Sequence, residues 1–408
     1  MKRLSQEELF RAALGLEEPW TVGKVEFSVD EQRLDIWLAY GEGAQFACPY
    51  GDAVQLQPYD AREHTWRHLN FFQFHTYLHA RVPRVRCPEH GVHQVETTWA
   101  RPGSGFTLLF EALVMLLAKA MPMRDLSRLV GEHDTRLWRV VKHYVEEARA
   151  KADFSEVQTL AVDETSSQRG HNYITLVAEP EKARILFATV GRDSATIARF
   201  REDFEQHGGQ ADAVKEIALD MSAAFIKGMS ETFSQAALVF DRFHATKLLT
   251  DAVDEVRRAE QRVQPILKNS RYLWLRNAED LRTDQITDLS ELRSLHLKTA
   301  RAYNLKMAFQ DFYDQPQDAA EAYLLRWYNW AIRSQLPPII RAAKTIRKHW
   351  HGVLGYHRSR VTNGMLEAFN GLIQSAKRRA RGYRNPQTLI LMAYLIAGKL
   401  SFNLPNPV

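Results

Sequence analysis

The sequence has few cysteines and no long apolar run. Its 408 residues contain two cysteines, Cys48 and Cys87, so a disulfide framework is excluded and the chain suits a reducing compartment. No stretch of about 18 apolar residues is present, and the segment 389–400 is too short to span a bilayer and contains Lys399. The N-terminus lacks the apolar core of a signal peptide. These absences predict a cytoplasmic protein with no membrane partner.

A glycine-rich phosphate loop is also missing. No Gly-Lys pair is followed by serine or threonine, so a nucleoside triphosphate is not the expected energy source. What is present is ample apolar material, with 45% hydrophobic and 11% aromatic residues, which predicts two or three folded domains. The net charge of +5 is compatible with a polyanionic partner, but many soluble enzymes are this basic.

Three carboxylates stand at positions that would bring them to one metal site. Asp163 and Asp220 each end an apolar, β-forming run, which predicts a place at the carboxyl edge of a buried strand. Glu367 follows a turn at Asn363-Gly364 and projects from the first turns of a predicted helix. Oxygen ligands suit two Mg²⁺ or Mn²⁺ ions, which can clamp both oxygens of a phosphodiester exchange. The alternative is that these acids are solvated, as most acids near strand ends are.

The order of predicted elements around these acids is informative. Strands are predicted at 160–163, 172–179, 184–190, 217–220 and 238–241, with helices after the third and the fourth. Three strands, a helix, a strand, a helix and a strand is the order of an RNase H-like sheet. Asp241 and His244 follow the last strand, either as accessory residues of the site or as a helix cap with a packed histidine.

A long helical segment separates the last strand from Glu367. Residues 245–360 are almost entirely helical by pattern, which predicts an all-helical insertion, with Trp274, Trp327 and Trp330 mostly packed in its core. Two basic runs could follow DNA phosphates, although basic runs are usually solvated faces. They comprise Arg341, Lys344, Arg347 and Lys348 on the insertion and Lys377, Arg378, Arg379 and Arg381 beyond Glu367.

Several motifs occur together in one order. Ala161-Val162-Asp163-Glu164-Thr165, Leu219-Asp220-Met221-Ser222, Asp241-Arg242-Phe243-His244 and Asn363-Gly364-Met365-Leu366-Glu367 closely resemble the DDE transposases of the ISL3 insertion-sequence family. The resemblance runs from about Cys48 to the C-terminus. It implies an enzyme that binds terminal inverted repeats in double-stranded DNA, and cuts and joins DNA with Asp163, Asp220 and Glu367 as metal ligands. A homodimer or higher oligomer on DNA is expected.

The family's N-terminal zinc module is matched in part. Cys48, Cys87 and His90 fall on ligand positions, but Gly51 stands where the family pattern has its second cysteine. Tetrahedral structural zinc needs four ligands, and Asp52 or His93 are weak substitutes. The two alternatives are a degraded zinc site and a module held by its β core with the cysteines as small buried residues. The missing ligand favours the second.

A helix-turn-helix pattern precedes the catalytic region. Helices are predicted from Phe106 to Pro122, from Met123 to Gly131 and again beyond His133. A recognition helix would expose Thr135, Arg136, Arg139 and Lys142 to the major groove. The alternative is an ordinary helical connector with a solvated basic face.

The predicted organisation is that of a multidomain α+β chain. Its parts are 1–46, a helix and hairpin; 47–104, a zinc-finger-like β-rich module; 105–152, the helix-turn-helix segment; 153–244, the first part of an RNase H-like α/β catalytic domain; 245–360, the helical insertion; and 361–408, the last catalytic part, with Glu367. Two alternative functions are an inactive DNA-binding relic and an RNase H-like nuclease or resolvase.

Overall fold

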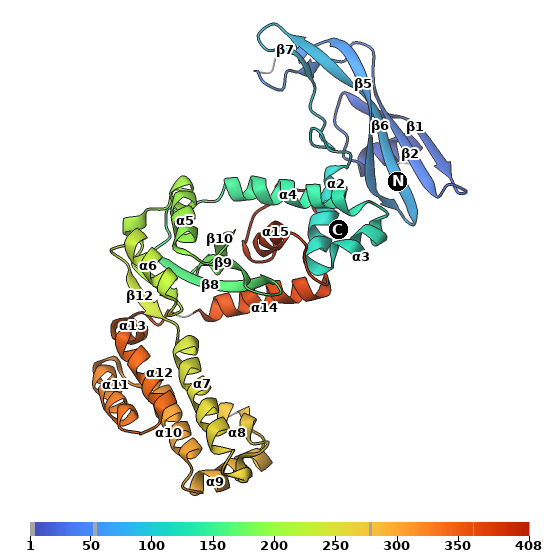
Figure 1. Cartoon of the computed structure of the whole chain (residues 1–408). Helices are drawn as coiled ribbons and strands as arrows, with labels where there is room; N and C mark the ends of the chain where they lie inside the picture. The colour runs from blue at the N-terminus through green and yellow to red at the C-terminus, as the bar shows by residue number, and fades with distance from the viewer. Residues whose placement is uncertain (1–4, 52–54, 277–279, 362, 408) are drawn as a thin grey trace. The chain divides into compact units, whose positions relative to one another are not determined.

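The computed structural model describes residues 5–51, 55–276, 280–361 and 363–407 (Figure 1). The chain divides into two compact units, Met1–Tyr144 with Ser401–Val408, and Val145–Leu400. In the described part of the chain, no helix is both long and apolar enough to cross a membrane.

The first unit contains a five-stranded sheet of order β1-β2-β6-β5, with β7 paired to β6. Its elements are α1 (Gln6–Ala13), β1 (Trp20–Ser28), β2 (Arg33–Tyr40), β3 (Phe46–Ala47), β4 (Gln55–Leu56), β5 (Pro58–Phe71), β6 (Phe74–Cys87), β7 (Gly91–Gln94), α2 (Leu108–Ala120), α3 (Met123–Val130) and most of α4 (Asp134–Ala150). The parallel pairing of β2 with β6 places strands from the predicted hairpin and from the predicted zinc module in one sheet.

Three helices follow the sheet, as the helix-turn-helix pattern predicts. The Thr107 hydroxyl accepts from the Phe110 amide and begins α2, while Pro122 occupies the N-cap position of α3. Gly131 ends α3 with φ 71°, a left-handed conformation that glycine adopts without strain. Leu137 and Val141 of α4 are fully buried, so this face of the helix packs inward.

The second unit is built on a five-stranded sheet of order β10-β9-β8-β11-β12. Its strands are β8 (Thr159–Gln168), β9 (Asn172–Glu179), β10 (Arg184–Val190), β11 (Glu216–Leu219) and β12 (Ala237–Phe240). β8, β9 and β10 pair antiparallel, whereas β8, β11 and β12 pair parallel. The predicted bounds of β9 and β10 are confirmed. The prediction that β8 ends at Asp163 is wrong, because its antiparallel pairing with β9 continues to Gln168.

Helices cover both faces of this sheet. Leu160 and Val162 lie in one core with Phe200 of α5 (Ser194–Gln206) and Phe225 of α6 (Ala223–Thr232). Ala161 points to the opposite face, where it packs in a second core. The helices on that side are α14 (Gly364–Arg379) and α15 (Pro386–Ala397). Since side chains alternate along a strand, Asp163 shares the face of Ala161 and therefore faces α14.

Helices make up most of the described chain between β12 and α14 (Figure 1). They are α7 (Arg242–Glu260), α8 (Arg271–Leu275), α9 (Thr283–Ser294), α10 (Lys298–Gln310), α11 (Gln317–Ile332), α12 (Pro337–Lys348) and α13 (Trp350–Ser359). A Cβ on Gly352 would lie 2.3 Å from the Phe240 ring, so α13 packs very closely on β12. Trp274 and Trp327 are buried, as predicted, whereas Trp330 is half exposed.

Candidate active site

Three aspartates lie in one row at the carboxyl edge of the parallel strands. Ala218 is paired with Ala161, so Asp220 and Asp163, each two residues further along, are level with each other. Leu219 is paired with Phe240, so Asp241 is level with Asp220 on the other side. The strand register, and not proximity in sequence, therefore gathers these carboxylates.

Asp163 is the most enclosed member of the row. Its side chain is 8% exposed, and Oδ1 accepts from the Glu164 amide at 2.8 Å while Oδ2 accepts from Asn370 Nδ2 at 2.9 Å. Burial raises the pKa of Asp163 to about 6, and the nearby Asp220 and Asp241 carboxylates add to the rise. The site thus concentrates negative charge that a cation would neutralise.

Asp241 is 3% exposed, and both of its carboxylate oxygens accept hydrogen bonds from neighbouring groups. It begins α7, and its Oδ2 accepts from the amides of Phe243 and His244 at 3.1 and 3.3 Å. Its Oδ1 accepts from the Asn363 amide at 3.1 Å. Burial favours the neutral form, but the hydrogen bonds from His244 and Asn363 outweigh it, so the pKa of Asp241 is lowered. Asp241 therefore caps α7, and its part as an accessory residue of the site stays a prediction.

His244 lies beside the row of acids, and its side chain is partly exposed. Its Nδ1 lies 3.3 Å from Asp241 Oδ2. This hydrogen bond raises the pKa of His244 against the effect of burial, and the charges of Asp163 and Asp220 raise it further. A protonated imidazole beside the acids can hold a phosphate oxygen of DNA.

Glu367 reaches the site because α14 is anchored along β8. Its amide donates to the Asn363 carbonyl at 2.9 Å in the first turn of the helix. Asn363 is fully buried and its Nδ2 donates to the Val162 carbonyl at 3.1 Å. The Glu367 side chain is exposed, and its pKa is raised by partial burial and by the charge of Asp241.

The anchoring residues of α14 were missed from the sequence. Asn370 bonds Asp163, and Gln374 Nε2 donates to Thr165 Oγ1 at 2.9 Å and to the Ser166 carbonyl at 2.8 Å. Asn363, Asn370 and Gln374 are seven and four residues apart, so they lie on one face of the helix. That spacing of amide side chains was the available signal.

The donor set fits hard divalent cations. Carboxylate oxygens are the ligands that Mg²⁺ and Mn²⁺ prefer, and Asn370 Oδ1 is buried beside Asp163 with no partner in the described residues. The oxygens of Asp163, Asp220 and Glu367 do not all lie within 4.8 Å of one another, unlike the Cys48, Cys87 and His90 group among the described residues. Side-chain movement would therefore accompany the binding of one ion by all three carboxylates.

Metal binding should weaken at low pH. Because the pKa of Asp163 is about 6, a proton competes with the cation below that pH, and affinity should fall about tenfold per pH unit there. Isothermal titration with Mn²⁺ at pH 5.0, 6.0 and 7.5 would measure this, as an order-of-magnitude effect. Equal affinities at the lowest and highest pH would contradict the assignment of Asp163 as a ligand.

A basic groove lies beside the C-terminal end of α14. This hollow of about 710 Å³ is lined by Ser167, Gln168, Arg169, Lys377, Arg378, Ala380, Arg381, Gly382, Tyr383 and Arg384. It holds five cationic side chains and no acidic one. Lys377 is less available to bind a phosphate, because its Nζ already donates to the Ser166 carbonyl at 2.8 Å. Arg169 and Arg384 join the run predicted from sequence, while Arg379 does not line the groove.

The other predicted DNA-binding residues are on the surface. Arg341, Lys344, Arg347 and Lys348 are exposed on α12, as are Thr135, Arg136, Arg139 and Lys142 on α4. Some already have partners: Arg341 pairs with Glu255 at 2.6 Å and Arg136 pairs with Glu132. Arg139 has no ion pair among the described residues. Their contacts with DNA remain predictions.

Three zinc-type ligands meet in the first unit. Cys48 Sγ and Cys87 Sγ lie 3.8 and 3.4 Å from His90 Nδ1. The hydrogen bond with His90 is the main cause that lowers the pKa of Cys87 to about 7. A Cβ on Gly51 would lie 3.2 Å from His90 Nδ1, so position 51 faces the cluster. Asp52 lies outside the described residues.

Zinc content should therefore respond to residue 51. Purified protein is expected to hold less than one zinc per chain, and Gly51→Cys should raise the ratio toward one by completing four ligands. Gly41→Cys is the matched control, because nothing lies within 4 Å of that position. Atomic absorption measures the ratio. One zinc per chain in the unsubstituted protein would show that another residue supplies the fourth ligand.

Family models match three stretches of the chain. Residues 160–393 match a DDE model described as transposase, residues 95–145 the helix-turn-helix domain of transposase family ISL3, and residues 44–90 the zinc-finger of transposase IS204/IS1001/IS1096/IS1165. These matches define a DDE transposase, an enzyme that binds DNA and uses divalent metal. The chain belongs to the ISL3 family of these transposases, as the motifs predicted.

Curated relatives agree along almost the whole chain. The chain is 27% identical over 435 residues to the transposase for insertion sequence element IS1557 of Mycobacterium tuberculosis, covering 95% of this chain and 94% of the relative. It is also 27% identical over 396 residues to the transposase for insertion sequence element IS1001 of Bordetella parapertussis, covering 93% and 95%.

Proposed function

We propose that Asp163, Asp220 and Glu367 are the metal-binding residues with which this transposase cuts the ends of its element and joins them to target DNA. The observation that carries the proposal is the strand register that puts Asp163 and Asp220 level, on the sheet edge where α14 brings Glu367. Two divalent ions, Mg²⁺ or Mn²⁺, would activate the attacking oxygen and stabilise the leaving one when bound.

The catalytic domain is proposed to be RNase H-like. The mixed sheet of three antiparallel strands followed by two parallel ones supports this, and the helices α7 to α13 would be the insertion. The proposed domains have the boundaries that the sequence predicts. Two or more copies are expected to act together, because an element has two ends to be cut and joined.

The chain's own groups have distinct parts in this proposal. Asp241 fixes His244 and the Asn363 turn, and so positions Glu367 without contacting the reacting atoms. His244 would hold a phosphate oxygen near the cut. Asn370 orients Asp163 and keeps one of its oxygens directed toward α14. The basic groove and α12 would bind flanking phosphates, and α4 would read the terminal repeats.

A strand-transfer assay with labelled element ends, target plasmid and Mg²⁺ tests the proposal. Asp220→Asn and Glu367→Gln should each lower cleavage and joining by about a thousandfold or more while binding of the ends stays intact, since they remove a ligand and not a DNA contact. Glu202→Gln, an exposed acid of α5 outside the site, is the control.

The same assay separates the alternatives. An inactive relic would bind ends without cutting them, and a nuclease or resolvase would cut without joining 3′ ends to new DNA. Retained cleavage in either acid variant would refute the assignment of that residue.

A further inference from the structure

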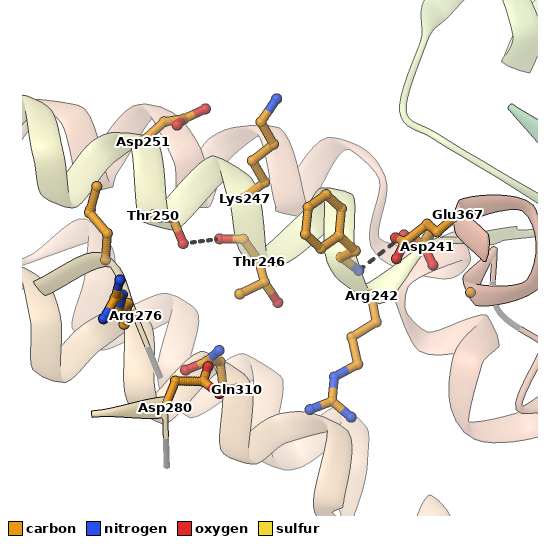
Figure 2. A pocket seen from close by; sticks show the side chains of 13 residues that line it. Asp241, Arg242, Thr246, Lys247, Thr250, Asp251, Arg276, Asp280, Gln310 and Glu367 are labelled. Carbon is orange, nitrogen blue, oxygen red and sulfur yellow. Dashed lines mark hydrogen bonds between the residues drawn. The ribbon is translucent and has the colours of Figure 1, made fainter. Parts of the chain in front are cut away.

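A cavity opens next to Glu367 that the metal chemistry does not use. It measures about 540 Å³ and lies between α7, the end of α8, Gln310 of α10 and the start of α14. Figure 2 shows Thr246 and Thr250 of α7 facing the side of Arg276 and Gln310, with Asp241 and Glu367 together at one end. The cavity is thus continuous with the candidate active site.

The size of the cavity sets the class of ligand. Pockets of about 300–1,000 Å³ hold small organic groups, and a nucleotide is within that range. A duplex is far too large, since its major groove alone is about 12 Å wide. A strand whose phosphate lay at the acids would bring its neighbouring nucleotide to the mouth of this cavity.

The lining combines a ring with polar groups. Phe243 is 56% exposed although it follows directly on the capping Asp241 and Arg242. Thr246 and Lys247 lie three and four residues beyond Phe243, and Thr250 lies three residues beyond Lys247, so all four lie on one face of α7. That face forms one wall of the cavity. An exposed aromatic ring offers a stacking surface for a base, and hydroxyl and amide groups can bond its edge.

The charges around the ring suit a nucleotide rather than a bare anion. Arg242, Lys247 and Arg276 line the cavity and have no ion pair among the described residues. Four acidic groups line it as well, namely Asp251 and Asp280 in addition to Asp241 and Glu367 at one end. The cations can meet flanking phosphates, while the mixture of donors and acceptors matches a neutral base.

The wall of the cavity opposite α7 includes Leu275 and Arg276, and a buried lysine stabilises their backbone. Lys306 is 1% exposed, and its Nζ donates to the carbonyls of Leu275 at 3.1 Å and Arg276 at 3.4 Å. A buried amine that satisfies the last carbonyls of α8 fixes the backbone there. The cavity therefore does not depend on a ligand to form its wall.

We propose that this cavity receives one unpaired nucleobase of the DNA strand next to the cut, stacked on Phe243. The proposal rests on the proposed function for the position of the cut. Taking a base out of a duplex costs free energy, least where the base is already unpaired, so the pocket would select an opened or single-stranded position at the element end. It would hold the scissile strand in register with the acids.

The test uses the full chain and a duplex of the element end with a short 3′ extension whose first unpaired base is 2-aminopurine. Binding should quench the fluorescence of this base by stacking. Phe243→Leu should abolish the quench and weaken binding of the extended DNA about tenfold, leaving the fully paired duplex unaffected. Phe243→Tyr should retain both properties. Trp330→Leu, at a half-exposed ring of α11, is the control.

The outcomes distinguish this inference from the proposed function. A quench that persists in Phe243→Leu, one that is lost in Trp330→Leu, or extended DNA that binds without quenching would overturn the pocket. Asp163→Asn should keep the quench and lose cleavage. If Asp163→Asn keeps cleavage, the proposed function fails, whatever the fluorescence shows.

Discussion

Asp163→Asn should make the metal-free protein more stable at pH 7.5 while abolishing cleavage. The pKa of Asp163 is about 6 in the folded chain, raised from 3.8 chiefly by burial. Because the folded state holds this proton more tightly than the unfolded state, the free energy of unfolding falls as pH rises from about 4 to about 6. At pH 7.5 the buried charge costs up to about 3 kcal/mol, which asparagine removes.

The surroundings accept the asparagine. Its Oδ1 can take the Glu164 amide hydrogen as the aspartate does. Asn370 now donates to Asp163, and its own Oδ1 is buried without a partner in the described part of the chain. Rotation of the Asn370 amide would let that oxygen accept from the new amide. The Asn370 Nδ2 group would then lie where Oδ1 lies now, with no acceptor among the described residues, and this offsets part of the gain in stability.

Urea unfolding at pH 4.0, 6.0 and 7.5, with chelator present, measures the effect. The substituted protein should gain stability at pH 7.5 and lose the pH dependence between 4 and 6 that comes from Asp163. Asp203→Asn is the comparison, since Asp203 is ion-paired with Arg149 and its loss should destabilise. If Asp163→Asn also destabilised the protein, Asp163 would be a structural acid.

Removing the arginines of the basic groove should flatten the salt dependence of DNA binding. Each phosphate contact adds about 0.9 to the slope of log affinity against log salt, so four lost contacts should lower the slope by about 3.6. The variant is Arg169→Ala, Arg378→Ala, Arg381→Asn and Arg384→Ala. Asparagine is chosen at 381 because Arg381 has φ 59°, where asparagine is less strained than alanine.

Lys377 is left in place because its amine bonds the Ser166 carbonyl and supports α14. Cleavage should fall together with the slope, since the groove is formed by α14, which also carries Glu367, and by β8, which carries Asp163.

The comparison variant removes four cations from α12. These are Arg341, Lys344, Arg347 and Lys348. Arg341 is paired with Glu255, and the guanidinium of Arg347 lies 4.4 Å from the Trp350 ring, so the same change of charge should lower the slope by less. Fluorescence anisotropy between 50 and 200 mM salt resolves the difference. An unchanged slope in the groove variant would identify the groove as a solvated basic face.

The sequence by itself determined much of the local structure. The apolar runs 172–179 and 184–190 become β9 and β10, because short apolar runs bounded by turns form strands that are buried on both faces. Pro122 and Gly131 mark the helix ends because each restricts or permits a particular backbone conformation. The family motifs also follow from sequence, since they consist of short stretches around Asp163, Asp220 and Glu367.

Only the tertiary structure decided how these parts meet. Asp220 comes level with both Asp163 and Asp241 through parallel pairing, which joins segments far apart in the chain and has no local signature. Packing between distant elements likewise produces three other features. They are the hydrogen bond from Lys377 to the Ser166 carbonyl, the buried contacts of Asn363 and the cavity beside Phe243. A pattern reports the conformation of its own backbone, whereas a partner is chosen by burial and hydrogen bonding across the whole core.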